Sequence, residues 1–144
     1  MVPHGAVHVP DRIDLDAGPL SGILSVLDYC WKSHDVPEMH DCVVVIGCDL
    51  PLLTSASVSR LIAESAAYEA VVASAKIDHW SCLVLRPASR PLLFAAYGDG
   101  ARSVGAATRR LRLGRVPVDD GELVNVNDRA TLARIIADEQ PNHR

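Results

Sequence analysis

Asp49 is the residue whose type and position are best suited to chemistry. It follows the run 42–48, which contains four consecutive β-branched residues (VVVI, 43–46), and the chain turns at Pro51. A short apolar run of this kind predicts a strand buried on both faces in the middle of a parallel sheet. Open α/β sheets bind ligands at the carboxyl ends of their strands, where a carboxylate suits Mg²⁺ held on a phosphate. The alternative is that Asp49 satisfies backbone amides in the turn.

The length and composition predict a single domain. Of the 144 residues, 49% are hydrophobic and 22% are charged, which is enough apolar material for one buried core. The formal net charge of −4 argues against a general nucleic-acid binder, and no apolar run is long enough to cross a bilayer. The first ten residues lack the features of a signal peptide, so we expect a cytoplasmic protein. We expect residues 140–144 to form a frayed tail after a domain at 1–139.

Strand and helix patterns alternate along the chain, which predicts an α/β sandwich with a mainly parallel sheet. The predicted strands are short apolar runs at 7–9, 42–48, 70–73, 82–85 and 115–118. The predicted helices have an apolar residue every three or four positions and begin near Pro19, Thr54, Ser89, Ser103 and Asn127. We expect Thr54 and Asn127 to be the N-cap residues of their helices.

Two of these helices have apolar faces that we expect to be buried. The face of the first helix consists of Leu20, Ile23, Leu24, Leu27 and Trp31. The face of the last helix consists of Leu132, Ile135 and Ile136. The cysteines form no Cys-x-x-Cys pair, so we expect free thiols at Cys30, Cys42, Cys48 and Cys82.

Three segments together carry a resemblance to a known family. They are residues 18–23 (GPLSGI), 47–52 (GCDLPL) and 123–127 (LVNVN). In this order and at these separations they resemble the molybdenum cofactor guanylyltransferases, the molybdopterin-guanine dinucleotide biosynthesis protein A family of the nucleotidyltransferase-like superfamily. The resemblance extends over about residues 7–138. Its most discriminating element is Asn125-Val126-Asn127, which we would not expect in the related cytidylyltransferases.

The resemblance implies a fold and a reaction. The fold is a Rossmann-like three-layer sandwich, and the reaction is guanylyl transfer from GTP to molybdenum-molybdopterin with Mg²⁺ as cofactor. Asp11 matches an aspartate that contacts the nucleotide, and Asp49 matches the aspartate that binds magnesium and the nucleotide phosphates. Asn125 and Asn127 match the paired asparagines near the active cleft. His79 lies where related chains often have a histidine, but Trp80 replaces the usual proline.

The sequence also departs from the family. Members begin with a strand and a Gly-rich loop (Leu-x-Gly-Gly, then Arg-Met-Gly and a lysine) that wraps the triphosphate, and this sequence has no such segment. We therefore expect a partial nucleotidyltransferase domain that lacks the first two βα units, on the order of 60 residues. The strand before Asp49 would then have an open apolar edge, which favours self-association. The chain alone is expected to be inactive.

Other interpretations remain open. The chain is alternatively a non-catalytic remnant or binding module, or a related nucleotidyltransferase with a different base specificity. A basic stretch either receives an anionic pterin or a carrier protein, or is a solvated helix face. It consists of Arg102, Arg109, Arg110, Arg112 and Arg115.

Overall fold

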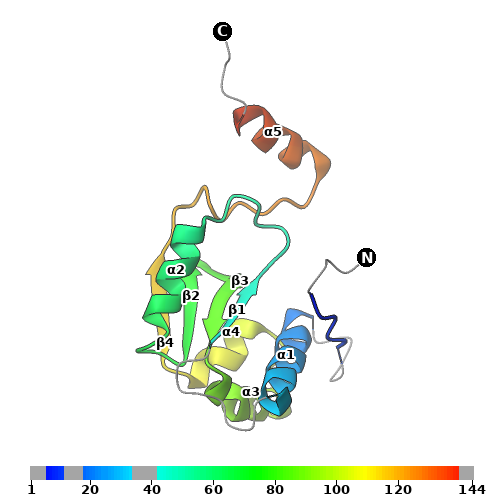
Figure 1. The fold of residues 1–144 in the computed structure, drawn as a ribbon, viewed down its shortest axis with the longest axis vertical. Coiled ribbons are helices and arrows are strands. Elements are labelled where there is room, and N and C mark those ends of the chain that lie inside the picture. The colour runs from blue at the N-terminus through cyan, green and yellow to red at the C-terminus, as the bar shows by residue number, and fades with distance from the viewer. Residues whose placement is uncertain (1–5, 12–17, 34–41, 140–144) are drawn as a thin grey trace.

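The computed structural model describes residues 6–11, 18–33 and 42–139. A four-stranded sheet lies at its centre, with strand order β1-β3-β2-β4 (Figure 1). The strands are β1 (Val43–Ile46), β2 (Ala70–Ser74), β3 (Asp78–Leu85) and β4 (Leu113–Pro117). Four of the predicted strands therefore form: β1 and β2 lie close to their predicted places, whereas β3 begins four residues before residue 82 and β4 two residues before residue 115.

The sheet is mixed. β3 runs antiparallel to both β1 and β2, whereas β2 and β4 are parallel, so β1, β2 and β4 point in one direction and β3 in the other. The predicted mainly parallel sheet is thus correct for the direction of three strands but wrong for the pairings beside β3. The reason is the connection between β2 and β3, which has room for residues 75–77 alone. A turn this short makes a hairpin, whereas a parallel pair needs a crossover connection.

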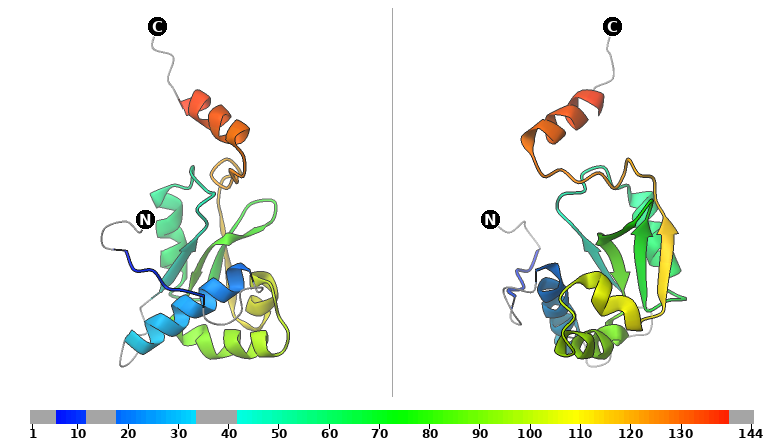
Figure 2. Two further views of the ribbon diagram at one scale, coloured as in Figure 1. Left: turned by 90° about the vertical axis from the view of Figure 1, so that its right-hand side faces the viewer. Right: turned by 180° about the vertical axis from the view of Figure 1, so that it is seen from behind.

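Helices cover both faces of the sheet, as in a three-layer sandwich (Figure 2). The helices are α1 (Pro19–Ser33), α2 (Ser55–Glu64), α3 (Arg90–Gly98), α4 (Val104–Ala107) and α5 (Arg129–Glu139). α1, α3 and α4 pack on the face formed by side chains such as Val72 and Leu83, and α2 packs on the face that contains Val71 and Val84. The predicted α/β class is therefore confirmed.

The local signals for helix starts are mostly confirmed. Pro19 begins α1, and Gly18 before it has a φ of 56°, a conformation that glycine adopts without steric cost. Thr54 caps α2 and accepts a hydrogen bond from the Ser57 N–H. Ser103 caps α4 in the same way, although that helix is a single short turn followed by a 3₁₀ turn at Thr108–Arg110.

Several expectations are wrong. Residues 7–9 form no strand, and Trp31 is 37% exposed, unlike the four other apolar residues of its helix face. Asp128 replaces Asn127 as the cap of α5, since its carboxylate accepts hydrogen bonds from the N–H and hydroxyl of Thr131. The predicted frayed tail at 140–144 lies outside the described residues.

The predicted burial of the last helix is also mostly wrong. Leu132 is 42% and Ile136 is 51% exposed, whereas Ile135 is 9% exposed. α5 stands away from the sheet in every view (Figures 1 and 2), and among the described residues neither core cluster on the faces of the sheet includes a side chain of α5. The amphipathic pattern was a correct sign of a helix but not of the surface against which that helix packs.

β1 lies at the edge of the sheet, not in its middle. Gly47 N–H donates to the carbonyl of Ser81 at 2.6 Å, and the register pairs Ile46 with Cys82. In an antiparallel pair, every second residue directs its main-chain N–H and C=O groups towards the neighbouring strand. Because Gly47 bonds to β3, Val45 and Val43 do so too, and Val44 and Ile46 direct these groups away from β3. No described strand pairs with these groups, and the Ile46 side chain is 48% exposed. The open apolar edge expected from the sequence is therefore present.

We propose that two copies of the chain pair through this edge, with Val44 of one copy opposite Ile46 of the other. That antiparallel register is self-complementary and satisfies the outward main-chain groups of both strands. Light scattering at micromolar concentration should show dimers or larger species. Ile46→Lys should give monomers because a charged edge strand resists pairing, whereas the matched control Ile77→Lys, in the exposed β2–β3 turn, should still associate. A monomeric wild-type chain with a cooperative melt would contradict this proposal.

Candidate functional site

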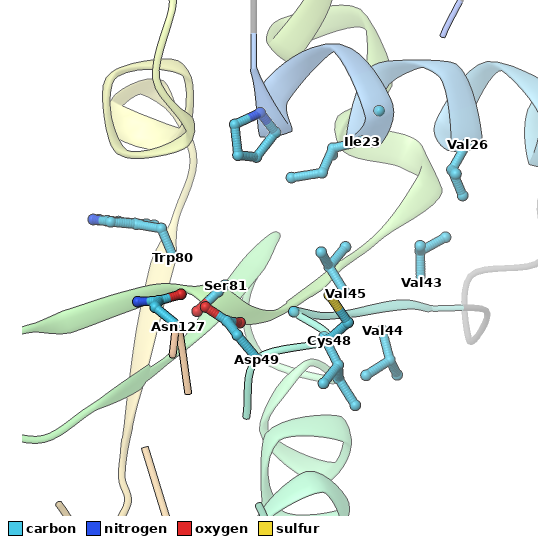
Figure 3. A pocket seen from close by; sticks show the side chains of 14 residues that line it. Ile23, Val26, Val43, Val44, Val45, Cys48, Asp49, Trp80, Ser81 and Asn127 are labelled. Carbon is cyan, nitrogen blue, oxygen red and sulfur yellow. The ribbon is translucent and has the colours of Figure 1, made fainter. Parts of the chain in front are cut away.

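A groove of about 650 Å³ runs along the open edge of β1, beneath α1 (Figure 3). α1 contributes small and apolar residues to it, and β1 with the loop that follows contributes residues 43–49. β3 adds Trp80 and Ser81, and Asn127 closes one end. Most of this lining is apolar, so a ligand bound here would lose much of its contact with water.

Asp49 is the one acidic residue among the described residues that line the groove. Gly47 makes its position possible: a Cβ added there would lie 2.5 Å from Asp49 Oδ1 and 3.1 Å from the Cβ of Ser81. Among the described residues, the Asp49 carboxylate accepts no hydrogen bond. This argues against the alternative that Asp49 satisfies turn amides, and it leaves both carboxylate oxygens available to a ligand.

The chain returns to Asp49 after β4 and brings Asn127 with it. Val126 N–H donates to the main-chain carbonyl of Asp49 at 2.9 Å, so the predicted Asn-Val-Asn element lies directly beside the predicted carboxylate. Figure 3 shows the Asn127 amide and the Asp49 carboxylate facing the same opening. Asn125 is exposed and does not line the groove, so of the two predicted asparagines the structure brings Asn127 to the site.

Asp11 approaches the site from the other side. A Cβ added to Gly22 would lie 3.4 Å from Asp11 Oδ1, which places this carboxylate against α1 at a residue that lines the groove. Asp11 itself is exposed and is not part of the lining. It therefore lies near the groove but not beside Asp49.

Sequence reasoning missed Glu122, which positions the returning segment. Its carboxylate accepts hydrogen bonds from the N–H of Thr54 (2.9 Å), the hydroxyl of Thr54 (2.7 Å) and the hydroxyl of Ser57 (3.1 Å). A local capping box would place Glu or Gln three residues after the Thr cap, but that position holds Ser57. Glu122 supplies the missing acceptor from 68 residues away. The lack of a Glu or Gln at position 57 indicated that the cap needs an acceptor from elsewhere, but the sequence did not show which acidic residue supplies it.

These hydrogen bonds also affect the ionisation of Glu122. The Thr54 hydroxyl and N–H hold the pKa of the Glu122 carboxyl below its usual range, because they stabilise the charged form. Leu123, the next residue, is 3% exposed and packs in the core on the α2 side of the sheet. The segment that carries Asn127 is thus held by a charged acceptor, a buried side chain and the Val126 hydrogen bond.

The donors around the opening suit a hard cation. Asp49 offers carboxylate oxygens and Asn127 an amide oxygen, and Mg²⁺ in nucleotide sites is commonly held by one or two carboxylates together with substrate phosphates. Within the described ranges, there is no group of three or more His, Cys, Asp or Glu side chains that could hold a metal ion. The residues present therefore fit a magnesium ion that arrives with a nucleotide.

A three-layer α/β sandwich with such a groove at a strand end is the architecture of a nucleotidyltransferase-like domain. The family model of the MobA-like NTP transferase domain matches residues 2–115. The chain therefore belongs to this family, which confirms the resemblance seen in its motifs. None of the helices among the described residues is long and apolar enough to cross a membrane.

Solved structures share the fold. Molybdopterin-guanine dinucleotide biosynthesis protein A from Archaeoglobus fulgidus matches with a TM-score of 0.65 and 19% identity, over 84% of this chain and 64% of that one. A protein from Aquifex aeolicus VF5 matches with a TM-score of 0.65 and 20% identity, over 83% of this chain and 61% of that one. The chain thus spans less than two thirds of the length of either structure. A search of curated proteins gave no match.

Glu122→Ala should destabilise the domain by about 1–2 kcal/mol, because it removes a charged acceptor from the start of α2. Since the folded-state pKa of Glu122 is lowered, its contribution is full above the ordinary pKa of glutamate, about 4.3, and is lost as the pH falls. Urea melts at pH 7 and at pH 3 should therefore show a larger difference between variant and wild type at pH 7.

The matched control is Asp120→Ala, which removes an exposed carboxylate from the same loop and should leave the pH 7 melt almost unchanged. Equal melts for Glu122→Ala and the wild type at pH 7 would show that Glu122 does not hold this segment.

Proposed function

We propose that this domain takes part in guanylyl transfer from GTP to molybdenum-molybdopterin. The observation that carries the proposal is the juxtaposition of Asp49 and Asn127 at one groove, joined through the Val126 hydrogen bond. The family match supports the general reaction class, and the Asn-Val-Asn element favours the guanylyl-transferring branch. In this reaction a terminal phosphate of the acceptor attacks the α-phosphate of GTP, a new P–O bond forms, and pyrophosphate leaves.

In the proposed reaction each predicted residue has a role at the groove. Asp49 would hold Mg²⁺, which when bound neutralises phosphate charge and orients the phosphates. Asn127 has an amide that can donate to or accept from a ligand at the same opening. Asp11 would help to hold the nucleotide, and Asn125 would contribute from the exposed part of its loop. Apolar residues of α1 and β1 would exclude water from the reacting groups.

The described residues that line the groove do not supply the positive charge that a triphosphate requires. They include no lysine or arginine, whereas Asp49 contributes a negative charge. One Mg²⁺ offsets part of the charge of a triphosphate, and the remainder must be met by main-chain N–H groups or by cationic side chains. We therefore propose that residues 1–144 alone do not catalyse the transfer.

Titration calorimetry of residues 1–144 with Mg²⁺ and GTP should show weak binding, with a Kd of roughly 1 mM or weaker. The reason is that phosphates near Asp49 would face a carboxylate without enough compensating charge. Binding in the low micromolar range, together with guanylyl transfer to molybdopterin, would overturn this expectation. It would mean that the chain contains a phosphate site other than the groove lining.

The role of Asp49 is tested in a longer protein that joins the family's Gly-rich phosphate segment to this domain. Asp49→Asn should abolish guanylyl transfer and leave the melting temperature almost unchanged, since the carboxylate makes no hydrogen bond within the described residues. Asp120→Asn, in the loop after β4, is the matched control and should keep full activity. Near-normal turnover by Asp49→Asn would exclude Asp49 as the metal ligand.

The same longer protein separates the alternatives. A panel of GTP, CTP and ATP tests base specificity, because a related nucleotidyltransferase of another specificity would prefer a different nucleotide. If the protein turns over none of these nucleotides while it remains folded, the interpretation as a non-catalytic binding module is favoured.

A further inference from the structure

The indole of Trp80 is shared by three separate hollows of the surface. It borders the groove that contains Asp49, a second hollow of about 380 Å³ lined by Arg102, and a third of about 360 Å³ lined by Arg109 and Arg115. Trp80 lies on β3 and is partly buried against the core on the α1 side. A large planar ring is therefore accessible from several directions, and cationic side chains are present on two of them.

Gly105 in α4 leaves room for the indole ring to lie close to the helix. A Cβ added at residue 105 would lie 2.9 Å from Cε2 and 3.1 Å from Nε1 of the indole, so the ring lies directly against the main chain of that helix. A side chain at this position would displace it. Because the indole packs against α4 and is partly buried against the core, few other orientations are open to it, which reduces the entropy lost when a second planar ring stacks on it.

Two of the neighbouring arginines have no acidic partner among the described residues. Arg110 pairs with Asp99 at 2.7 Å, and Arg115 pairs with Asp78 at 3.0 Å. Arg102 and Arg109 are exposed and, among the described residues, form no ion pair. The Arg102 guanidinium lies 4.5 Å from the centre of the Tyr97 ring and donates to the Tyr97 carbonyl at 2.9 Å, which limits its motion.

We propose that Trp80, Arg102 and Arg109 bind a planar heterocycle that carries anionic groups. The ring would stack on the indole, and a phosphate or carboxylate would bind one of the two guanidinium groups. The proposal rests on the proposed function, in which this ligand is the acceptor and its reacting end extends past Trp80 into the Asp49 groove. It assigns part of the basic stretch to a binding site and not to a solvated helix face.

The probe is 6-carboxypterin, and unsubstituted pterin is the uncharged control. The sequence contains two tryptophans, so a ¹⁵N-labelled chain gives two indole N–H signals, which Trp31→Phe assigns. We expect 6-carboxypterin to shift the Trp80 signal and not the Trp31 signal, and pterin to bind roughly tenfold more weakly. The absence of any shift at Trp80, or equal affinity for the two probes, would overturn the proposal.

Arginine variants test the charged half of the site. The double variant Arg102→Gln/Arg109→Gln should weaken 6-carboxypterin binding roughly tenfold, whereas Arg110→Gln, whose partner is Asp99, should bind like the wild type. Equal weakening by Arg110→Gln would mean that general positive charge attracts the probe, which contradicts a built site. Trp80→Phe keeps a ring for stacking, and its melt shows whether the fold is retained.

Asp49→Asn distinguishes this inference from the proposed function. That variant should keep the shift of the Trp80 signal, because the carboxylate takes no part in binding the probe. If Asp49→Asn leaves transfer intact in the longer protein but the Trp80 shift persists, the proposed role of Asp49 fails and the heterocycle site stands. If transfer depends on Asp49 and no shift occurs, the site at Trp80 fails alone.

Discussion

The return of the chain from β4 to the end of β1 is the constraint on which the candidate site depends. Asp49 and Asn127 are far apart in sequence, and neither lies in a helix or a strand, so no packing of regular elements brings them together. Their proximity results from the three hydrogen bonds that Glu122 accepts at the start of α2 and from the single bond between Val126 and Asp49. Because Glu122 also completes the cap of α2, the same carboxylate stabilises a helix and closes the site.

The open edge of β1 and the candidate groove are two aspects of one structural feature. A strand beside β1 would pair with the outward groups of Val44 and Ile46, and its side chains would fill the space beneath α1. In its absence among the described residues, the apolar side chains on the facing surface of α1, such as Ile23 and Val26, border a hollow. Ligand access and a tendency to associate therefore have the same origin, and any segment that pairs with β1 would change the shape of the groove.

The sequence allowed much of the fold to be predicted, because its signals are local. Pro19 and Thr54 mark helix starts, and the run 43–46 marks a strand, since each signal depends on nearby residues alone. The errors arise where distant residues decide. The position of β1 depends on which strands are available to pair, and the exposure of Leu132 depends on where α5 packs. The motifs placed Asp49 and Asn127 at one site, but Glu122 could not be found because its partners lie in another element.

The distribution of charge around Trp80 is consistent with these separate roles. If a guanidinium group lay beside Asp49, the two would pair, and the carboxylate would be less available to a cation. The indole instead separates the groove of Asp49 from the hollows that Arg102 and Arg109 line, and Asp78 neutralises the neighbouring Arg115. Asp78 and Trp80 point to the same side of β3, because side chains alternate along a strand. One face of β3 thus carries both Asp78, which pairs with Arg115, and the Trp80 ring. This ring separates Arg102 and Arg109 from Asp49, the candidate metal ligand.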